Sequence, residues 1–142
     1  MKPDLSMPKD LLKRRKAGRY AAICVIGFDA EPESHRIGAA EDVEILLSRL
    51  QLGTWHDLHF RRVIWTPGIE GAKHVADEAE KFLTDTGFHL GRHWFRAPLN
   101  LIDDLFTAAV TSLNLRTWRH TELLNHLQAQ SDYEADRFAR GM

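Results

Sequence analysis

The chain has 142 residues, 44% of them hydrophobic and 27% charged. This is the composition of one globular domain and excludes a wholly disordered protein. The longest apolar run, residues 20–28, is far shorter than the roughly 20 residues that a membrane span requires. No apolar region follows the first residues, as it would in a secretory signal. The single cysteine, Cys24, excludes an internal disulfide and a cysteine-based zinc site. We therefore expect a cytoplasmic protein without a membrane segment.

The net charge of −1 conceals an uneven distribution of charge along the chain. Residues 1–19 carry seven basic and two acidic side chains, a net +5, and the other 123 residues carry twelve basic and eighteen acidic ones, a net −6. A basic arm over residues 1–18 is suited to a polyanion such as DNA, because phosphate contacts need no sequence readout. A solvated basic helix is the equally open alternative. The cations predicted to contact DNA are Lys13, Arg14, Arg15, Lys16 and Arg19.

The first half of the chain is predicted to contain a buried hairpin. Pro8 favours the start of a short helix that ends before Gly18. Residues 20–27 form a continuous apolar run, which is typical of a buried strand. Residues 28–34 contain Pro32 and several turn-forming residues, which predicts the hairpin loop. A short second strand follows at residues 35–38.

The rest of the chain alternates between helical and extended patterns. Apolar residues at helical spacing predict amphipathic helices, and less regular apolar segments predict strands. The predicted elements are a helix at 40–51, a strand at 58–66, helices at 70–85 and 98–112 on either side of a short element at 94–95, and a more polar helix at 115–138. This order indicates an α/β (α+β) fold with a small, mostly antiparallel sheet flanked by helices. Residues 19–112 are expected to form the main domain and residues 113–142 a helical extension.

Common catalytic motifs are missing from the sequence. The eight histidines form no HExxH pattern or other zinc signature, and there is no P-loop or GxGxxG segment. Cys24 lies within the apolar run, where an inert core thiol is the favoured interpretation. These residues alone therefore assign no chemistry.

Six short motifs in order nevertheless resemble those of the GIY-YIG nuclease superfamily, most closely its phage-protein branch. The resemblance covers about residues 19–106; its motifs are residues 22–27 (AICVIG), 35–38 (HRIG), 48–51 (SRLQ), the strand that follows, 79–83 (AEKFL) and 92–95 (RHWF). In that branch the second motif often reads Lys-Ile-Gly, and a Glu-Trp-Phe element follows the helix glutamate. The resemblance implies a three-stranded antiparallel sheet flanked by helices. It also implies hydrolysis of DNA phosphodiesters with Mg²⁺ or Mn²⁺, in a bacterial or phage protein.

The resemblance assigns roles to particular residues. Arg49 matches the family arginine that contacts the phosphate, and a guanidinium holds a phosphate in fixed geometry. Glu80 matches the metal ligand, because Leu83 stands three residues on, where the family has an apolar residue; Glu78 is the alternative. A carboxylate is a hard oxygen ligand suited to these cations. Arg36 would add positive charge.

Two positions depart from the family pattern. Cys24 stands where the first motif normally ends in tyrosine, and Arg36 stands where the second begins with tyrosine or lysine. One of these positions usually supplies or supports the group that activates water. Arg36 stays protonated near neutral pH and is a poor base, and Cys24 would need a lowered pKa.

Three functions are therefore open. The first is a GIY-YIG-type, metal-dependent DNA endonuclease with Arg49, Arg36, Glu80 and the Cys24 position at its site. The second is a degenerate member that binds DNA without cutting it, the function that the missing tyrosine favours. The third is an interaction module that docks through its C-terminal helix. The oligomeric state is not predicted.

Overall fold

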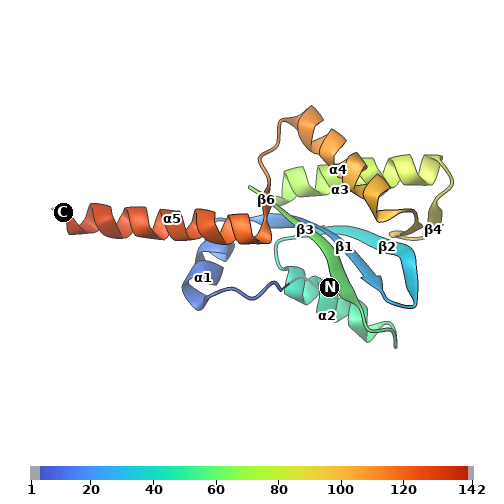
Figure 1. Cartoon of the computed structure of the whole chain (residues 1–142), viewed down its shortest axis with the longest axis horizontal. Coiled ribbons are helices and arrows are strands. Elements are labelled where there is room, and N and C mark those ends of the chain that lie inside the picture. The colour runs from blue at the N-terminus through green and yellow to red at the C-terminus, as the bar shows by residue number, and fades with distance from the viewer. Residues whose placement is uncertain (1–3, 141–142) are drawn as a thin grey trace.

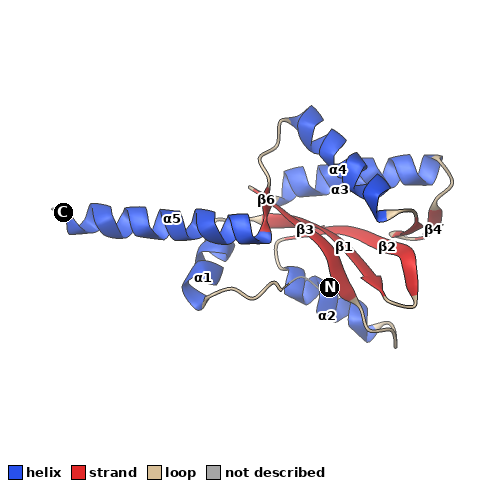
Figure 2. Cartoon of the chain, in the orientation of Figure 1, coloured by secondary structure: helices blue, strands red, loops and turns tan. Residues whose placement is uncertain are grey.

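The computed structural model describes residues 4–140, which form five helices around one six-stranded antiparallel sheet (Figure 1). The sheet order is β4 (His89–Gly91), β5 (Trp94–Arg96), β2 (Glu31–Ala40), β1 (Ala21–Phe28), β3 (His59–Thr66) and β6 (Trp118–Arg119). The helices are α1 (Lys9–Ala17), α2 (Val43–Leu52), α3 (Ile69–Asp85), α4 (Leu99–Leu113) and α5 (His120–Ala139). The predicted mixed α/β class is confirmed. The expectation of three strands is wrong, because three strands of two or three residues extend the central β2-β1-β3 sheet at its edges (Figure 2).

Strand β1 lies at the centre of the sheet and all eight of its residues are buried. Successive side chains of a strand point to opposite faces, so β1 contributes to two cores. The odd-numbered residues 21–25 pack with α3 and α4, and the even-numbered residues 22–28 pack with α1, α2 and α5. Burial on both faces explains why this segment is apolar throughout, and the predicted buried strand is confirmed.

The hairpin is tighter than predicted, because β2 begins at Glu31 and only two residues separate it from β1. Its stability comes from Arg61 on the neighbouring strand β3. The Arg61 guanidinium donates hydrogen bonds to the carbonyl oxygens of Phe28, Glu31, Pro32 and Ser34. These long-range bonds satisfy carbonyls that the sequence pattern assigned to a loop.

We expect Gly27→Ala to destabilise the protein by about 1–3 kcal/mol, because overpacking and lost hydrogen bonds add up. A Cβ on Gly27 would lie 2.3 Å from Arg61 Cζ, so the guanidinium would have to leave the carbonyls that it holds. Urea denaturation measures the change. Gly53→Ala is the control, since its Cβ would meet only one backbone oxygen at 3.6 Å. Equal stability of the two variants would contradict this account.

The basic N-terminal segment folds onto the domain as α1. Its Leu11 and Arg15 side chains are buried, and Leu11 belongs to the same core as β1 and α5. Arg15 forms two hydrogen bonds with the Glu44 carboxylate, at 3.0 and 3.1 Å, and its Cζ lies 4.7 Å from the centre of the Trp65 ring. Residues 4–18 are therefore part of the folded unit, and residues 1–3 of the predicted arm lie outside the described residues.

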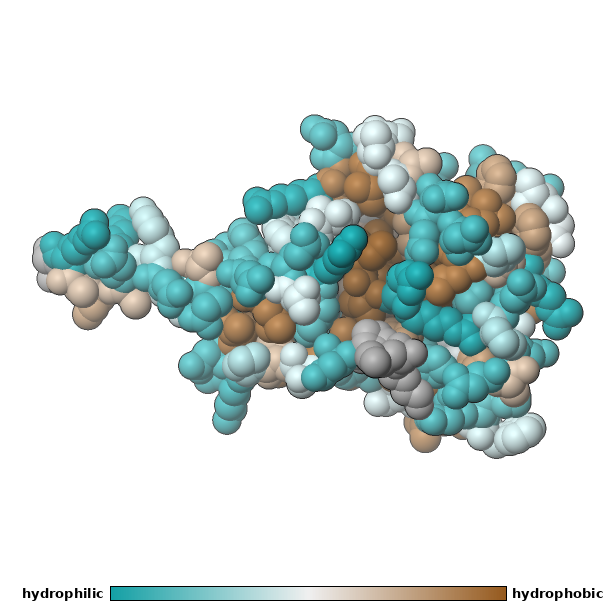
Figure 3. Space-filling model, viewed as in Figure 1, coloured by the Kyte–Doolittle hydropathy of each residue, from teal (hydrophilic) through white to brown (hydrophobic). Residues whose placement is uncertain are grey.

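The C-terminal region is divided differently from the prediction. Asn114 adopts a left-handed conformation (φ 51°) that ends α4, and Trp118–Arg119 then pair with β3 before α5 begins at His120. The first turns of α5 pack on the core, and the second half projects beyond the sheet with a mostly hydrophilic surface (Figures 1 and 3). Within residues 4–140, no helix combines the length and apolarity that crossing a membrane requires.

Candidate functional site

An uncovered sheet edge organises the candidate site. Strand β5 pairs only with Ser34, His35 and Arg36 of β2. On the side of β2 away from β1, no strand within the described residues therefore pairs with residues 38–40. Two adjoining hollows of about 670 and 180 Å³ lie along this edge, next to α2 and α3. We call them together the β2-edge groove and define it by Arg36, Gly38, Arg49, Glu80, Arg92 and His93.

Arg36 lines both hollows and is the central cation of the groove. Its side chain is half-buried, yet it forms no hydrogen bond or ion pair with any described residue. Burial lowers the pKa of Arg36 from its usual value, an effect that the nearby Glu80 carboxylate partly offsets. A Cβ on Gly38 would lie 2.9 Å from Arg36 Nη1, so the glycine leaves room for the guanidinium beside the strand. A partly desolvated guanidinium without a partner is suited to an anionic ligand.

Arg49 and Arg92 add two exposed cations to the same hollow. Arg49 comes from the last turn of α2, and Arg92 from the two-residue turn between β4 and β5. Arg92 adopts φ 51°, and its carbonyl accepts a hydrogen bond of 2.7 Å from the His89 ring, which holds the turn. The structure therefore brings Arg36 and Arg49, both predicted from the sequence, to one place and adds Arg92.

Glu80 faces the groove, whereas its sequence alternative Glu78 does not. Glu80 is largely buried and lines the hollow that contains Arg36. Glu78 is exposed, lies 3.6 Å from His74 on its own helix and lines a separate hollow between α3 and α4. The two glutamates therefore line different hollows, and of the two only Glu80 shares a hollow with Arg36.

His93 is held by Glu80 and was not assigned a role from the sequence. Its Nδ1 lies 2.7 Å from Glu80 Oε1, and the imidazole is 56% exposed. This contact assigns the proton of the neutral ring to Nδ1, which leaves Nε2 as an acceptor at the groove. A carboxylate that orients a histidine is an arrangement suited to general base catalysis. The sequence held one signal that could have pointed to His93. His93-Trp94-Phe95 stands where the phage-protein branch of the GIY-YIG superfamily has Glu-Trp-Phe.

Cys24 lies outside the groove, which corrects its assignment to the site. Its side chain is fully buried in the core on the α2 face of the sheet. Burial raises the pKa of the Cys24 thiol to about 12. A thiol in this state neither reaches a substrate nor accepts a proton from water near neutral pH. The structure thus places an inert core thiol at the position of the family tyrosine.

Most cations of the basic segment are already paired with carboxylates. The ion pairs are Arg14–Glu134, Arg15–Glu44, Lys16–Asp42 and Arg19–Glu41. Lys13 is exposed and forms no ion pair within residues 4–140. Neutralisation by these partners weakens the expected attraction of the segment for phosphate, so the DNA-binding role of these five residues stays a prediction.

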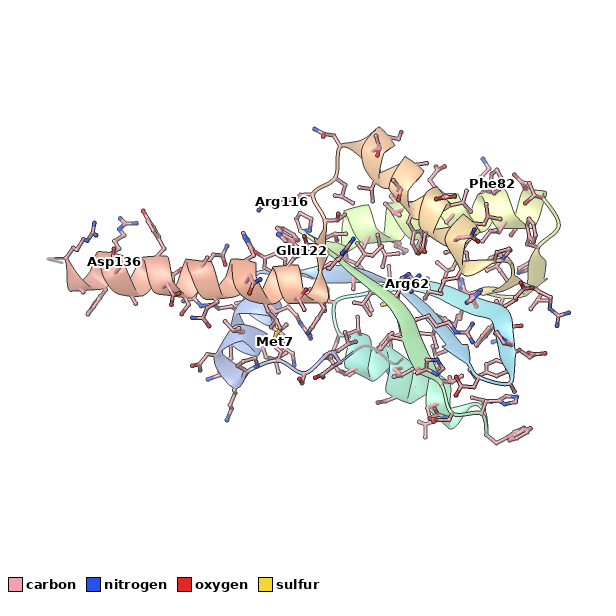
Figure 4. The ribbon with its side chains drawn as sticks, viewed as in Figure 1. Met7, Arg62, Phe82, Arg116, Glu122 and Asp136 are labelled. Carbon is pink, nitrogen blue, oxygen red and sulfur yellow. The ribbon has the colours of Figure 1, made fainter. Side chains whose placement is uncertain are left out.

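Two arginines on another side of the molecule are engaged as well. Arg62 and Arg116 are labelled in Figure 4. Arg62 forms an ion pair with Asp103 on α4, at 3.0 Å, and Arg116 lies over the Trp118 ring. The β2-edge groove differs from this surface and from the basic segment, because Arg36 and Arg49 have no carboxylate partner among the described residues.

Metal binding by side chains alone finds little support in the groove. No three histidine, cysteine or acidic side chains within residues 4–140 are grouped so that they could hold a metal ion. Glu80 uses only Oε1 for its contact with His93, and its Oε2 forms no hydrogen bond with a described residue. Mg²⁺ accepts one or two carboxylates together with water and substrate phosphate oxygens, so this single oxygen fits such a cation.

Comparisons of the chain with protein-family models, with curated proteins and with solved structures give no significant match.

Proposed function

We propose that this protein is a nuclease-type phosphodiesterase that acts on DNA at the β2-edge groove. The observation that carries this proposal is the convergence of Arg36, Arg49 and Glu80 on one groove from β2, α2 and α3. The resemblance of the sequence to GIY-YIG nucleases led to the same three residues, and the element order hairpin, helix, strand, helix agrees with it.

The two arginines would bind the phosphate. Arg36 reaches it from the strand and Arg49 from the helix, so two guanidinium groups contact the non-bridging oxygens from different sides. Such charge-assisted hydrogen bonds strengthen as negative charge builds up in the transition state. Neither arginine needs to give up an ion pair within the described chain before it binds.

The Glu80–His93 pair would activate the attacking water. His93 Nε2 would accept a proton from water while the water oxygen forms its bond to phosphorus. The bond between phosphorus and the leaving oxygen breaks, its electron pair stays on that oxygen, and the oxygen takes a proton from the solvent. Glu80 Oε1 orients the imidazole at 2.7 Å. Glu80 Oε2 would hold a divalent cation, which, when bound, supplies positive charge beside the scissile phosphate.

DNA binding without cleavage is the second candidate. It is favoured by Cys24, whose buried thiol occupies the position of the family residue that usually supports water activation. In this case the arginines bind phosphate, and the Glu80–His93 pair has only a structural role.

Cleavage of supercoiled plasmid DNA with Mg²⁺ or Mn²⁺ tests the proposal. We expect Glu80→Gln to abolish cleavage and Arg49→Ala to weaken DNA binding by about 10- to 150-fold, as expected for a lost hydrogen bond to a charged group. Arg137→Ala is the matched control, since Arg137 is also an exposed arginine without an ion pair in residues 4–140 but lies on α5. Lys13→Ala tests the basic segment on α1 in parallel.

The outcomes separate the candidates. Cleavage that Glu80→Gln removes supports the nuclease, and salt-dependent binding that Arg49→Ala weakens, without cleavage, supports the binding module. Binding that depends on Lys13 and not on Arg49 would place the interface on α1 and overturn the proposal.

A further inference from the structure

A column of four aromatic rings reaches the surface next to the β2-edge groove. Trp55 stacks on His56 with ring centres 4.3 Å apart, and His56 stacks on Phe28 at 4.2 Å. Phe28 then meets the edge of Trp94 at 5.8 Å. We call these four residues the aromatic stack. Phe28 is buried, whereas Trp55 is 89% exposed, so the outer face of the Trp55 ring is open to another planar ring.

The loop that carries Trp55 is held in place by hydrogen bonds. The Gln51 amide donates to the carbonyls of Thr54 and His56 and accepts from the N–H of Leu58. The His56 N–H donates to Thr54 Oγ1. Trp55 is therefore presented on an ordered loop, and a ligand that binds it pays little entropy for ordering the site.

The aromatic stack and the groove share a border. Thr54 and Trp94 line the same hollow as Arg36 and Arg49, so the loop that carries the exposed ring borders the cations of the groove. We infer that Trp55 stacks on an unpaired nucleobase of a DNA strand whose phosphates lie in the groove. This inference rests on the proposed function, because the groove has to bind a nucleic acid backbone.

Charge complementarity favours a nucleic acid over an apolar partner at this surface. Cations that contact phosphates, combined with an aromatic face that accepts a base, are the two elements of single-strand recognition. The bases of a regular duplex are stacked on both faces and cannot meet Trp55. The substrate class is therefore single-stranded DNA, or DNA with an unpaired base next to the phosphate that the arginines bind.

Fluorescence anisotropy without divalent cations tests this inference. Labelled single-stranded oligothymidylate and a blunt duplex of equal length are titrated with the full chain and its variants. We expect Trp55→Ala to weaken single-strand binding by about 5- to 150-fold, the usual range for one lost stacking contact, and to leave duplex binding unchanged. Trp55→Phe should retain most of the affinity. Leu52→Ala is the matched control, because Leu52 is an equally exposed apolar residue outside the aromatic stack.

The inference is overturned if Trp55→Ala leaves the single-strand affinity unchanged. It is also overturned if the variant lowers the single-strand and duplex affinities equally. Self-association of the protein that disappears in Trp55→Ala would also overturn it, since the ring would then contact a second copy.

Arg49→Ala separates this inference from the proposed function. If Arg49→Ala weakens binding and Trp55→Ala does not, the inference fails alone. If Trp55→Ala weakens single-strand binding and Arg49→Ala has no effect, the proposed function fails, and with it the placement of the phosphates in the groove, whereas base stacking on Trp55 stands.

Discussion

Replacement of His93 by alanine should lower the rate of plasmid cleavage by roughly 10²- to 10⁴-fold, the usual contribution of a general base. The imidazole is 56% exposed at the groove, and its Nδ1 is held by Glu80 Oε1, so the side chain supports no core. DNA affinity should stay unchanged, because the arginines that we propose bind the phosphate are intact. Free imidazole in the buffer should restore part of the rate, since alanine leaves space beside Glu80.

His74→Ala is the matched control for this prediction. His74 is also an exposed histidine beside a glutamate, but its partner Glu78 lies on the same helix and both line a hollow away from the groove. Cleavage by the His74 variant should equal that of the unmodified protein. A His93→Ala protein that cleaves at the normal rate would exclude His93 as the base.

The second prediction concerns the ion pair between the buried Arg15 and the exposed Glu44. We expect Glu44→Ala to lower the free energy of unfolding by about 3–5 kcal/mol, because it leaves a buried guanidinium without its counter-charge. Arg15 is 1% exposed, whereas Glu44 is 49% exposed. Arg15→Met should therefore cost less, since the carboxylate can turn to water and the methionine packs beside Trp65. Urea denaturation of both variants measures the asymmetry.

Two further variants test the same explanation. The double variant Arg15→Met, Glu44→Ala should be more stable than Glu44→Ala alone, because no buried charge remains. Glu41→Ala, which breaks the exposed pair with Arg19, should change stability far less than Glu44→Ala, because water screens exposed charges. Equal losses in Glu44→Ala and Glu41→Ala would show that burial of Arg15 is unimportant.

The same pair predicts a loss of stability in acid. Burial alone raises the pKa of Glu44, but the hydrogen bonds from Arg15 and from its own backbone outweigh burial and lower the pKa from 4.5 to about 2. Between these two values the unfolded chain takes up a proton that the folded protein does not bind, so stability falls as the pH decreases. The loss of stability below pH 4.5 should be smaller in Arg15→Met, which lacks the hydrogen bonds to Glu44. Midpoints of urea denaturation above and below pH 4.5, measured for both proteins, test this.

Local pattern was sufficient for most of the elements. The apolar residues of β1 and the apolar face of α3 are buried in the core. Their spacing in the sequence therefore predicts a strand and a helix without knowledge of the elements that cover them. The helix at 98–112 and the strand at 58–66 were predicted within a residue of α4 and β3. Strands β4 and β6 were missed because two- or three-residue strands exist only through pairing with a neighbour.

Part of the candidate site could also be predicted. Arg36, Arg49 and Glu80 came from short motifs whose spacing survives in the sequence, and the structure places all three at the β2-edge groove. His93 belongs to the motif at residues 92–95, but that motif assigned it no role. Its role depends on the β4–β5 turn, which brings its ring to Glu80.

The sequence by itself determined the apolar centre of the sheet, the mixed α/β class and the residues from which a phosphate site can be built. Only the tertiary structure decided which charges are available. The most basic segment is largely neutralised because partners distant in the chain, Glu44 and Glu134, fold against it. Arg36 and Arg49, which stand alone in the sequence, keep no carboxylate partner among the described residues. Charge pairing depends on distance in space, and a count of charges along the chain does not contain that distance.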